Sequence, residues 1–140
     1  MQIGMDEEFI VIDKTECLSG NSPHVDEVDV SVRVKLKEFT GNYLSISILH
    51  AEIERFIDGL KKLGESGRGK TVLNSFNPKE FSLTIRSSVF SDNFMVDIVL
   101  SRYQYTGPVE WETSISGGFE VAPDCLPALF SASKKLLRIQ

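Results

Sequence analysis

The chain has 140 residues, of which 41% are hydrophobic and 25% are charged. This composition supports one hydrophobic core and leaves little length for a second, so we predict a single domain over residues 1–140. With 15 basic and 20 acidic residues the net charge is −5, a sign that disfavours the phosphates of nucleic acid as a partner.

The N-terminal segment and the cysteines predict a cytoplasmic protein. The stretch from Met1 to Glu8 is acidic where a secretory signal begins with basic residues. No apolar run approaches the roughly 18 residues of a membrane span, so we expect no membrane association. Cys17 and Cys125 form no CxxC pair, which indicates two reduced thiols.

The first third of the chain predicts an initial strand, a loop and a hairpin. Residues 14–29 are rich in turn formers and acids and are predicted to form a loop. Apolar and polar residues then alternate over residues 30–37 and again over residues 43–49, which predicts two strands. Gly41 and Asn42 are typical of a turn, so we expect them to join these strands.

The spacing of apolar residues then changes to three and four, which predicts an amphipathic helix over residues 50–63. Gly64 is placed to end this helix. Alternation returns at residues 81–85 and at residues 94–100, and each run predicts a further strand.

The clearest alternation of the chain runs from Val109 to Val121. It places Trp111 and Phe119 on one face of a strand and Glu110 and Glu112 on the other. We therefore expect Trp111 to be buried in the core. The two glutamates on one face either form an acid/base pair or are simply solvated, and solvation is the interpretation we favour.

A terminal helix is predicted from Leu126 to Leu137, after an N-cap at Pro123-Asp124. Strands joined by short loops, with only two helices, predict an α+β fold: an antiparallel sheet of about five or six strands with both helices packed on one face. Residues 1–29 would supply an N-terminal strand and the acidic loop, and residues 30–140 the sheet and the helices.

The segment from Gly64 to Thr71 matches the phosphate-binding pattern GxxxxGK[ST], through Gly64, Gly69, Lys70 and Thr71. In such a loop backbone amides hold the phosphates, and a helix begins directly after it. Here the predicted helix precedes the loop instead. We therefore favour a plain connecting loop, and keep nucleotide binding by these four residues as an alternative.

No catalytic or metal-binding pattern is complete. His50 and Glu52 match the first half of a zinc deaminase motif, but the region around Cys125 has one cysteine where that motif needs two. The sequence shows no nucleophile elbow and no HExxH pair. We therefore predict no catalytic residue, no metal, no cofactor and no enzymatic activity.

One order of features along the chain resembles a known family. It consists of a helix with a Leu-x-x-Leu step, a short segment and a proline, one strand, two longer strands, and a final motif before the last helix. These features are Leu60 and Leu63; Thr71 to Phe76 and Pro78; Phe81 to Ile85; Gly118-Phe119-Glu120; and Asp124-x-Leu126-Pro127. The order resembles WapI-type immunity proteins, with which bacteria neutralise polymorphic contact-dependent toxins. The resemblance implies an antiparallel sheet with two helices and action by stoichiometric binding.

The preferred hypothesis is therefore a binding module that blocks a cognate toxin. The acids Glu110, Glu112, Asp26 and Glu27 favour a basic toxin domain, whose approach they would steer; alternatively, these acids only keep the chain in solution. Two other hypotheses are a nucleotide-binding protein built on residues 64–71 and an inactive subunit of a homo-oligomer. The sequence leaves the oligomeric state open.

Overall fold

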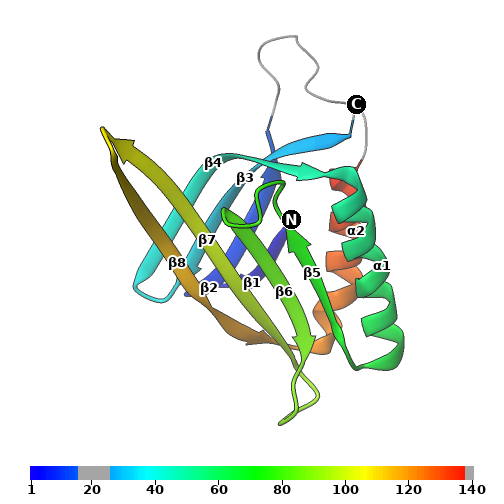
Figure 1. Cartoon of the computed structure of the whole chain (residues 1–140). Helices are drawn as coiled ribbons and strands as arrows, with labels where there is room; N and C mark the ends of the chain where they lie inside the picture. The colour runs from blue at the N-terminus through cyan, green and yellow to red at the C-terminus, as the bar shows by residue number, and fades with distance from the viewer. Residues whose placement is uncertain (16–25, 138–140) are drawn as a thin grey trace.

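The computed structural model describes residues 1–15 and 26–137 of the chain. These residues form two four-stranded antiparallel sheets and two α-helices (Figure 1). The first sheet has the order β1-β2-β3-β4. Its strands are β1 (Gln2–Met5), β2 (Glu8–Lys14), β3 (Glu27–Leu36) and β4 (Phe39–Leu49).

The second sheet has the order β5-β6-β7-β8. The chain enters it through the helix α1 and leaves it through a short 3-10 helix and the helix α2. These elements are α1 (His50–Ser66), β5 (Lys70–Asn74), β6 (Phe81–Ser87), β7 (Phe94–Thr106), β8 (Val109–Val121), η1 (Pro123–Cys125) and α2 (Leu126–Leu136).

The predicted α+β class with antiparallel pairing and two helices is confirmed, but the single sheet of five or six strands is wrong. The described chain passes from β4 directly into α1, so each sheet is a separate run of sequence neighbours. The strands β1 and β5 were also not predicted. β1 has only four residues and includes Gly4, and β5 begins at Lys70, inside the segment that was interpreted as a connecting loop.

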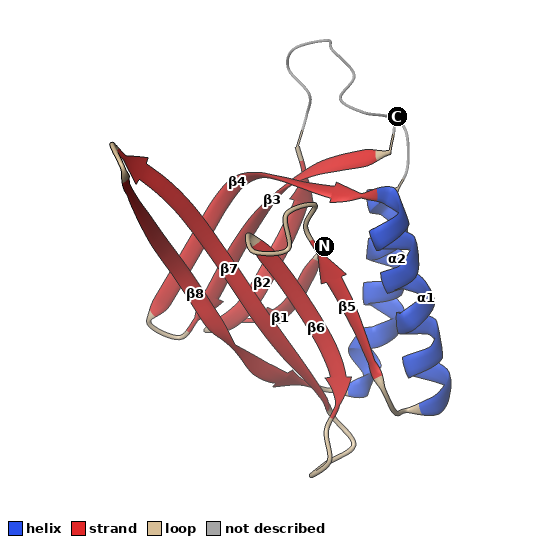
Figure 2. Cartoon of the chain, in the orientation of Figure 1, coloured by secondary structure: helices blue, strands red, loops and turns tan. Residues whose placement is uncertain are grey.

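The apolar faces of the two sheets turn towards each other. A methyl group on Gly41 of β4 would lie 2.8 Å from Cγ2 of Ile115 in β8, and one on Gly117 of β8 would lie 3.0 Å from Cδ1 of Leu36 in β3. The helix α1 packs mainly against β5 and α2. Figure 2 shows the two helices together at one side of the molecule, beside β5.

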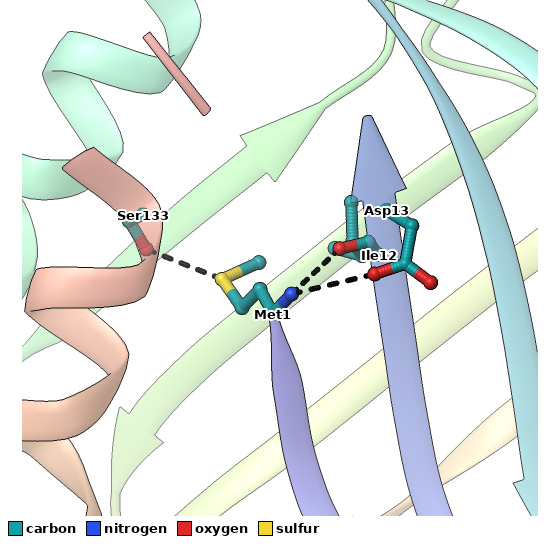
Figure 3. Close-up of polar contacts among 4 residues, drawn as sticks. All are labelled: Met1, Ile12, Asp13 and Ser133. Carbon is teal, nitrogen blue, oxygen red and sulfur yellow. Dashed lines mark hydrogen bonds and ion pairs between the residues drawn. The ribbon is translucent and has the colours of Figure 1, made fainter. Parts of the chain in front are cut away.

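The strand β1 is held in place from both of its sides (Figure 3). The amino group of Met1 donates a hydrogen bond to the carbonyl of Ile12 in β2 (2.8 Å) and lies 3.8 Å from Oδ1 of Asp13. The Met1 sulfur accepts a hydrogen bond from Oγ of Ser133 in α2 (3.2 Å). The first strand and the last helix of the described chain are therefore tied together.

Gly41 and Gly64 do not lie at the turn and the helix end that the sequence predicts. The β3–β4 turn falls at Lys37 and Glu38, where Lys37 adopts a φ of 58°. Gly41 lies inside β4, where it allows the close approach to β8 described above. The helix α1 continues past Gly64 and is capped by Gly67, which has a φ of 70° and donates its N–H to the carbonyl of Leu63.

Candidate functional site

The β7–β8 hairpin is longer than the sheet that supports it. The strand β6 pairs with β7 only from Phe94 to Leu100, whereas β7 and β8 stay paired up to Thr106 opposite Val109. Residues 102–113 therefore form a two-stranded ribbon, which we call the hairpin tip. Figure 1 shows this tip, in yellow, projecting away from the helices.

The outer face of the hairpin tip combines two tyrosines with two glutamates. Tyr103 lies directly opposite Glu112, and Tyr105 lies directly opposite Glu110. The Tyr103 hydroxyl donates a hydrogen bond to Oε1 of Glu112 (3.4 Å). Partial burial, the charge of Glu112 and the hydrogen bond to it, and then the charge of Glu110 and Tyr105, raise the pKa of Tyr103 above its ordinary value. The four side chains therefore lie on one face of the tip, and Tyr103 and Glu112 are joined by a hydrogen bond.

The inner face of the hairpin tip carries Trp111, opposite Gln104. Trp111 shares this face with Phe119, as the alternation predicts. Its predicted burial is wrong: Trp111 is 59% exposed, whereas Phe119 is 8% exposed. The reason is its position, because Phe119 lies near β1 of the other sheet and Trp111 lies on the projecting ribbon.

The four acids predicted to bind a partner lie in two separate places. Asp26 and Glu27 lie where β4 passes into α1: the carbonyl of Asp26 accepts the N–H of His50 (2.7 Å), and Oε2 of Glu27 accepts the hydroxyl of Ser47 (2.9 Å). Figure 1 shows this junction and the hairpin tip at opposite sides of the molecule. One compact contact therefore cannot use Asp26 or Glu27 together with the tip acids.

The segment that matches a phosphate-binding loop forms hydrogen bonds within the protein. Gly64 lies inside α1, Lys70 begins β5, and the buried hydroxyl of Thr71 donates to the carbonyl of Phe56 (3.1 Å). Three loop amides have acceptors of their own: Gly67 to the carbonyl of Leu63 (2.8 Å), Arg68 to Oγ of Ser66 (3.2 Å), and Gly69 to Oγ of Ser87 (3.1 Å). The geometry gives nucleotide binding no support, because a helix ends here and a strand follows.

A groove of about 1090 Å³ lies between the end of α1, the start of α2 and the loop that joins β6 to β7. Its lining includes Phe94, Leu126 and Phe130, and Phe90 at the tip of the loop is 96% exposed. This groove was not predicted, because its walls come from three segments that are distant in the sequence. The one local hint was the pair Val89-Phe90 among serines.

Within residues 1–15 and 26–137, no three or more His, Cys, Asp or Glu side chains are grouped so that they could hold a metal ion. Burial, followed by the charge of Asp124, raises the pKa of the Cys125 thiol. Cys17 and most of the predicted acidic loop lie outside the described residues. None of the helices described is both long and apolar enough to cross a membrane.

Exposed tyrosine and tryptophan side chains are typical of protein-binding modules, because such side chains anchor protein interfaces. A model of the WapI-like immunity protein family matches residues 4–139, and the chain belongs to this family. The family resemblance predicted from the sequence is thereby confirmed. Comparisons with curated proteins and with solved structures find no match.

Proposed function

We propose that this chain is an immunity protein that neutralises a cognate toxin by forming a stoichiometric complex with it, without enzymatic turnover. The observation that carries the proposal is the family match over residues 4–139. The exposed aromatic side chains of the hairpin tip support it, because such side chains anchor protein interfaces. We further propose that the complex forms in the cytoplasm.

We propose that the toxin domain is basic. The chain carries a net charge of −5, and among the described residues neither Glu110 nor Glu112 forms a salt bridge. Complementary charge speeds the encounter of two proteins, and the same negative charge disfavours nucleic acid and anionic membranes as partners. Asp26 and Glu27 would add to the long-range field from the other side of the molecule.

A titration tests both the complex and its stoichiometry. A candidate toxin domain, taken from a gene that neighbours the gene for this chain, is assayed for its activity while the purified chain is added. We expect activity to fall in proportion to added chain and to vanish at equimolar amounts, and the two proteins to co-elute in size-exclusion chromatography. A toxin domain of an unrelated family should stay fully active.

Two outcomes contradict the proposal. Complete neutralisation by a small fraction of an equivalent would indicate enzymatic inactivation of the toxin. Full toxin activity in the presence of excess folded chain, without co-elution, would show that the chain is not the immunity protein for that toxin.

A further inference from the structure

The hairpin tip exposes a large aromatic side chain on each of its two faces. Tyr105 is 70% exposed on the outer face, and Trp111 is 59% exposed on the inner face. Their opposite orientation follows from the register, in which Tyr105 pairs with Glu110 and Gln104 pairs with Trp111. A partner lying flat against the ribbon would bury only one of them.

The tip has no covering element within the described chain. The strand β6 pairs with β7 no further than Leu100, and the last residue bound from that side is Ser101, whose N–H donates to the carbonyl of Glu80 (2.8 Å). Two-stranded ribbons are marginal structures by themselves. No element of the described residues buries the aromatic side chains of this ribbon, which leaves them available to another molecule.

The charge of the tip determines the chemistry of that molecule. Glu110 and Glu112 lie on the outer face, and the one basic residue of the tip, Arg102, lies at its base. Arg102 pairs with Thr113 and therefore lies on the inner face, which is the face of Trp111 and not that of the two glutamates. The outer face of the tip is therefore left acidic.

A carboxylate that enters an interface unpaired is strongly unfavourable, so a partner must supply cations to this face. An arginine meets both demands of the face, because a guanidinium pairs with carboxylates and also stacks on tyrosine rings. Apart from Arg102 at its base, the inner face of the tip carries only uncharged side chains, and its exposed Trp111 and Val109 suit an apolar wall.

We propose that the hairpin tip is a wedge that inserts into a cleft of the toxin, with Trp111 packed against an apolar wall and Tyr105, Glu110 and Glu112 against a wall lined by arginine or lysine. This proposal rests on the proposed function and adds where on the chain the toxin binds and how the two proteins fit together.

The first test measures the affinity of single variants for the toxin domain encoded beside this gene. We expect Trp111→Ala and Tyr105→Ala each to raise Kd by about 30-fold or more, the range of interface anchors. The matched control is Phe90→Ala, which removes an even more exposed aromatic side chain from the β6–β7 loop. Its Kd should stay within about twofold of wild type. Unchanged melting temperatures show that the variants fold.

The second test addresses the acidic wall. Replacing Glu110 and Glu112 together by glutamine should slow association several-fold and flatten its dependence on salt. The control replaces two exposed acids of α1, by Glu54→Gln with Asp58→Asn; it removes the same charge away from the tip and should change both quantities much less. Equal behaviour of the two double variants would remove the cation-lined wall from the proposal.

A third test follows Trp111 directly. It is the only tryptophan of the chain, so the chain labelled with fluorotryptophan carries one fluorine resonance. We expect that resonance to shift and to lose its solvent exposure when unlabelled toxin domain is added. A resonance that is unchanged in a complex proven by co-elution would overturn the wedge.

The outcomes separate the two proposals. If the wild-type chain binds and only one of the two aromatic variants loses affinity, the tip lies flat and the wedge is wrong. If neither loses affinity, or if Phe90→Ala loses as much, the contact lies elsewhere, while the immunity function stands. A wild-type chain that does not bind the toxin domain contradicts both.

Discussion

The two halves of the β7–β8 hairpin share one register and one alternation but differ in what covers them. In the base half, residues 94–101 and 114–121, Ile98 is 1% exposed, because β6 extends the sheet beside it and the first sheet covers its inner face. In the tip, Trp111 on the same face is 59% exposed. One ribbon can therefore contribute to the core at one end and present a surface at the other.

The base half of the hairpin is closely packed against the strands around it. A methyl group on Gly118 would collide with the backbone carbonyl of Val96, and one on Gly41 would meet the side chain of Ile115. The tip shows no such crowding at Gly107, where a methyl group would meet nothing nearby. The difference predicts that stability depends on the base half and binding on the tip.

The largest effect should come from the core of the base half. Ile98→Ala would leave a cavity and should lower the free energy of unfolding by about 2–5 kcal/mol, as large-to-small core substitutions do. Trp111→Ala, on the same face in the tip, should lower it by less than about 1 kcal/mol. Urea titrations of both variants measure this; equal losses would mean that the tip is packed as tightly as the base.

The next effect concerns the contact between the sheets. Gly41→Ala places a methyl group 2.8 Å from Cγ2 of Ile115 and should destabilise the fold by about 1–3 kcal/mol, the usual cost of overpacking. The matched control is Gly64→Ala in α1, where the nearest atom is 4.0 Å away at Leu126. Because alanine favours helix, this control should stabilise by about 0.4–1 kcal/mol. A neutral Gly41→Ala would show that the sheets can separate at this point.

A smaller effect is expected at the loop after α1. Lys70→Ala should change the free energy of unfolding by no more than about 0.5 kcal/mol, as at an ordinary exposed position. Magnesium ATP or GTP should not shift the melting temperature of the wild-type chain. Micromolar nucleotide binding that is lost in Lys70→Ala would establish a second binding surface. Binding would then not depend on the hairpin tip alone.

The smallest effect concerns the proton of Tyr103. Its pKa is raised by partial burial and by Glu112, so Glu112→Gln should lower it towards the ordinary value. Because the folded pKa exceeds the unfolded one, any stability linked to this proton is present below the unfolded pKa and is lost as pH rises through the folded pKa. Phenolate absorbance of both proteins, with Tyr103→Phe to assign the transition, measures the shift. An unchanged pKa of Tyr103 in Glu112→Gln would show that Glu112 does not raise it.

Much of this architecture follows from local patterns. Alternation placed Glu112 and Trp111 on opposite faces of β8, and the helical spacing found α1. The glycines were harder to assign: Gly41 resembled a turn residue and Gly64 a helix end, yet the turn lies at Lys37 and the helix cap at Gly67. Glycine serves both tight turns and close approaches, and its neighbours in sequence do not tell which.

The candidate site was only half predictable. Glu110 and Glu112 could be named, because an exposed face of an alternating strand is a local property. Tyr105 was not named, since β7 was expected to end at Leu100 and continues to Thr106. The separation of Asp26 from these acids also depends on how the sheets are placed.

The sequence by itself determined the α+β class, the direction of each side chain along β8 and the family to which the chain belongs. The class and the side-chain directions follow from the periodicity of residues along the chain, and the family follows from a resemblance in the order of features. Only the tertiary structure decided that the described residues form two four-stranded sheets. It also decided that β7 and β8 extend together beyond the end of their pairing with β6. Periodicity decides which way a side chain points relative to its own strand, whereas its burial depends on residues far away in sequence that lie across from it.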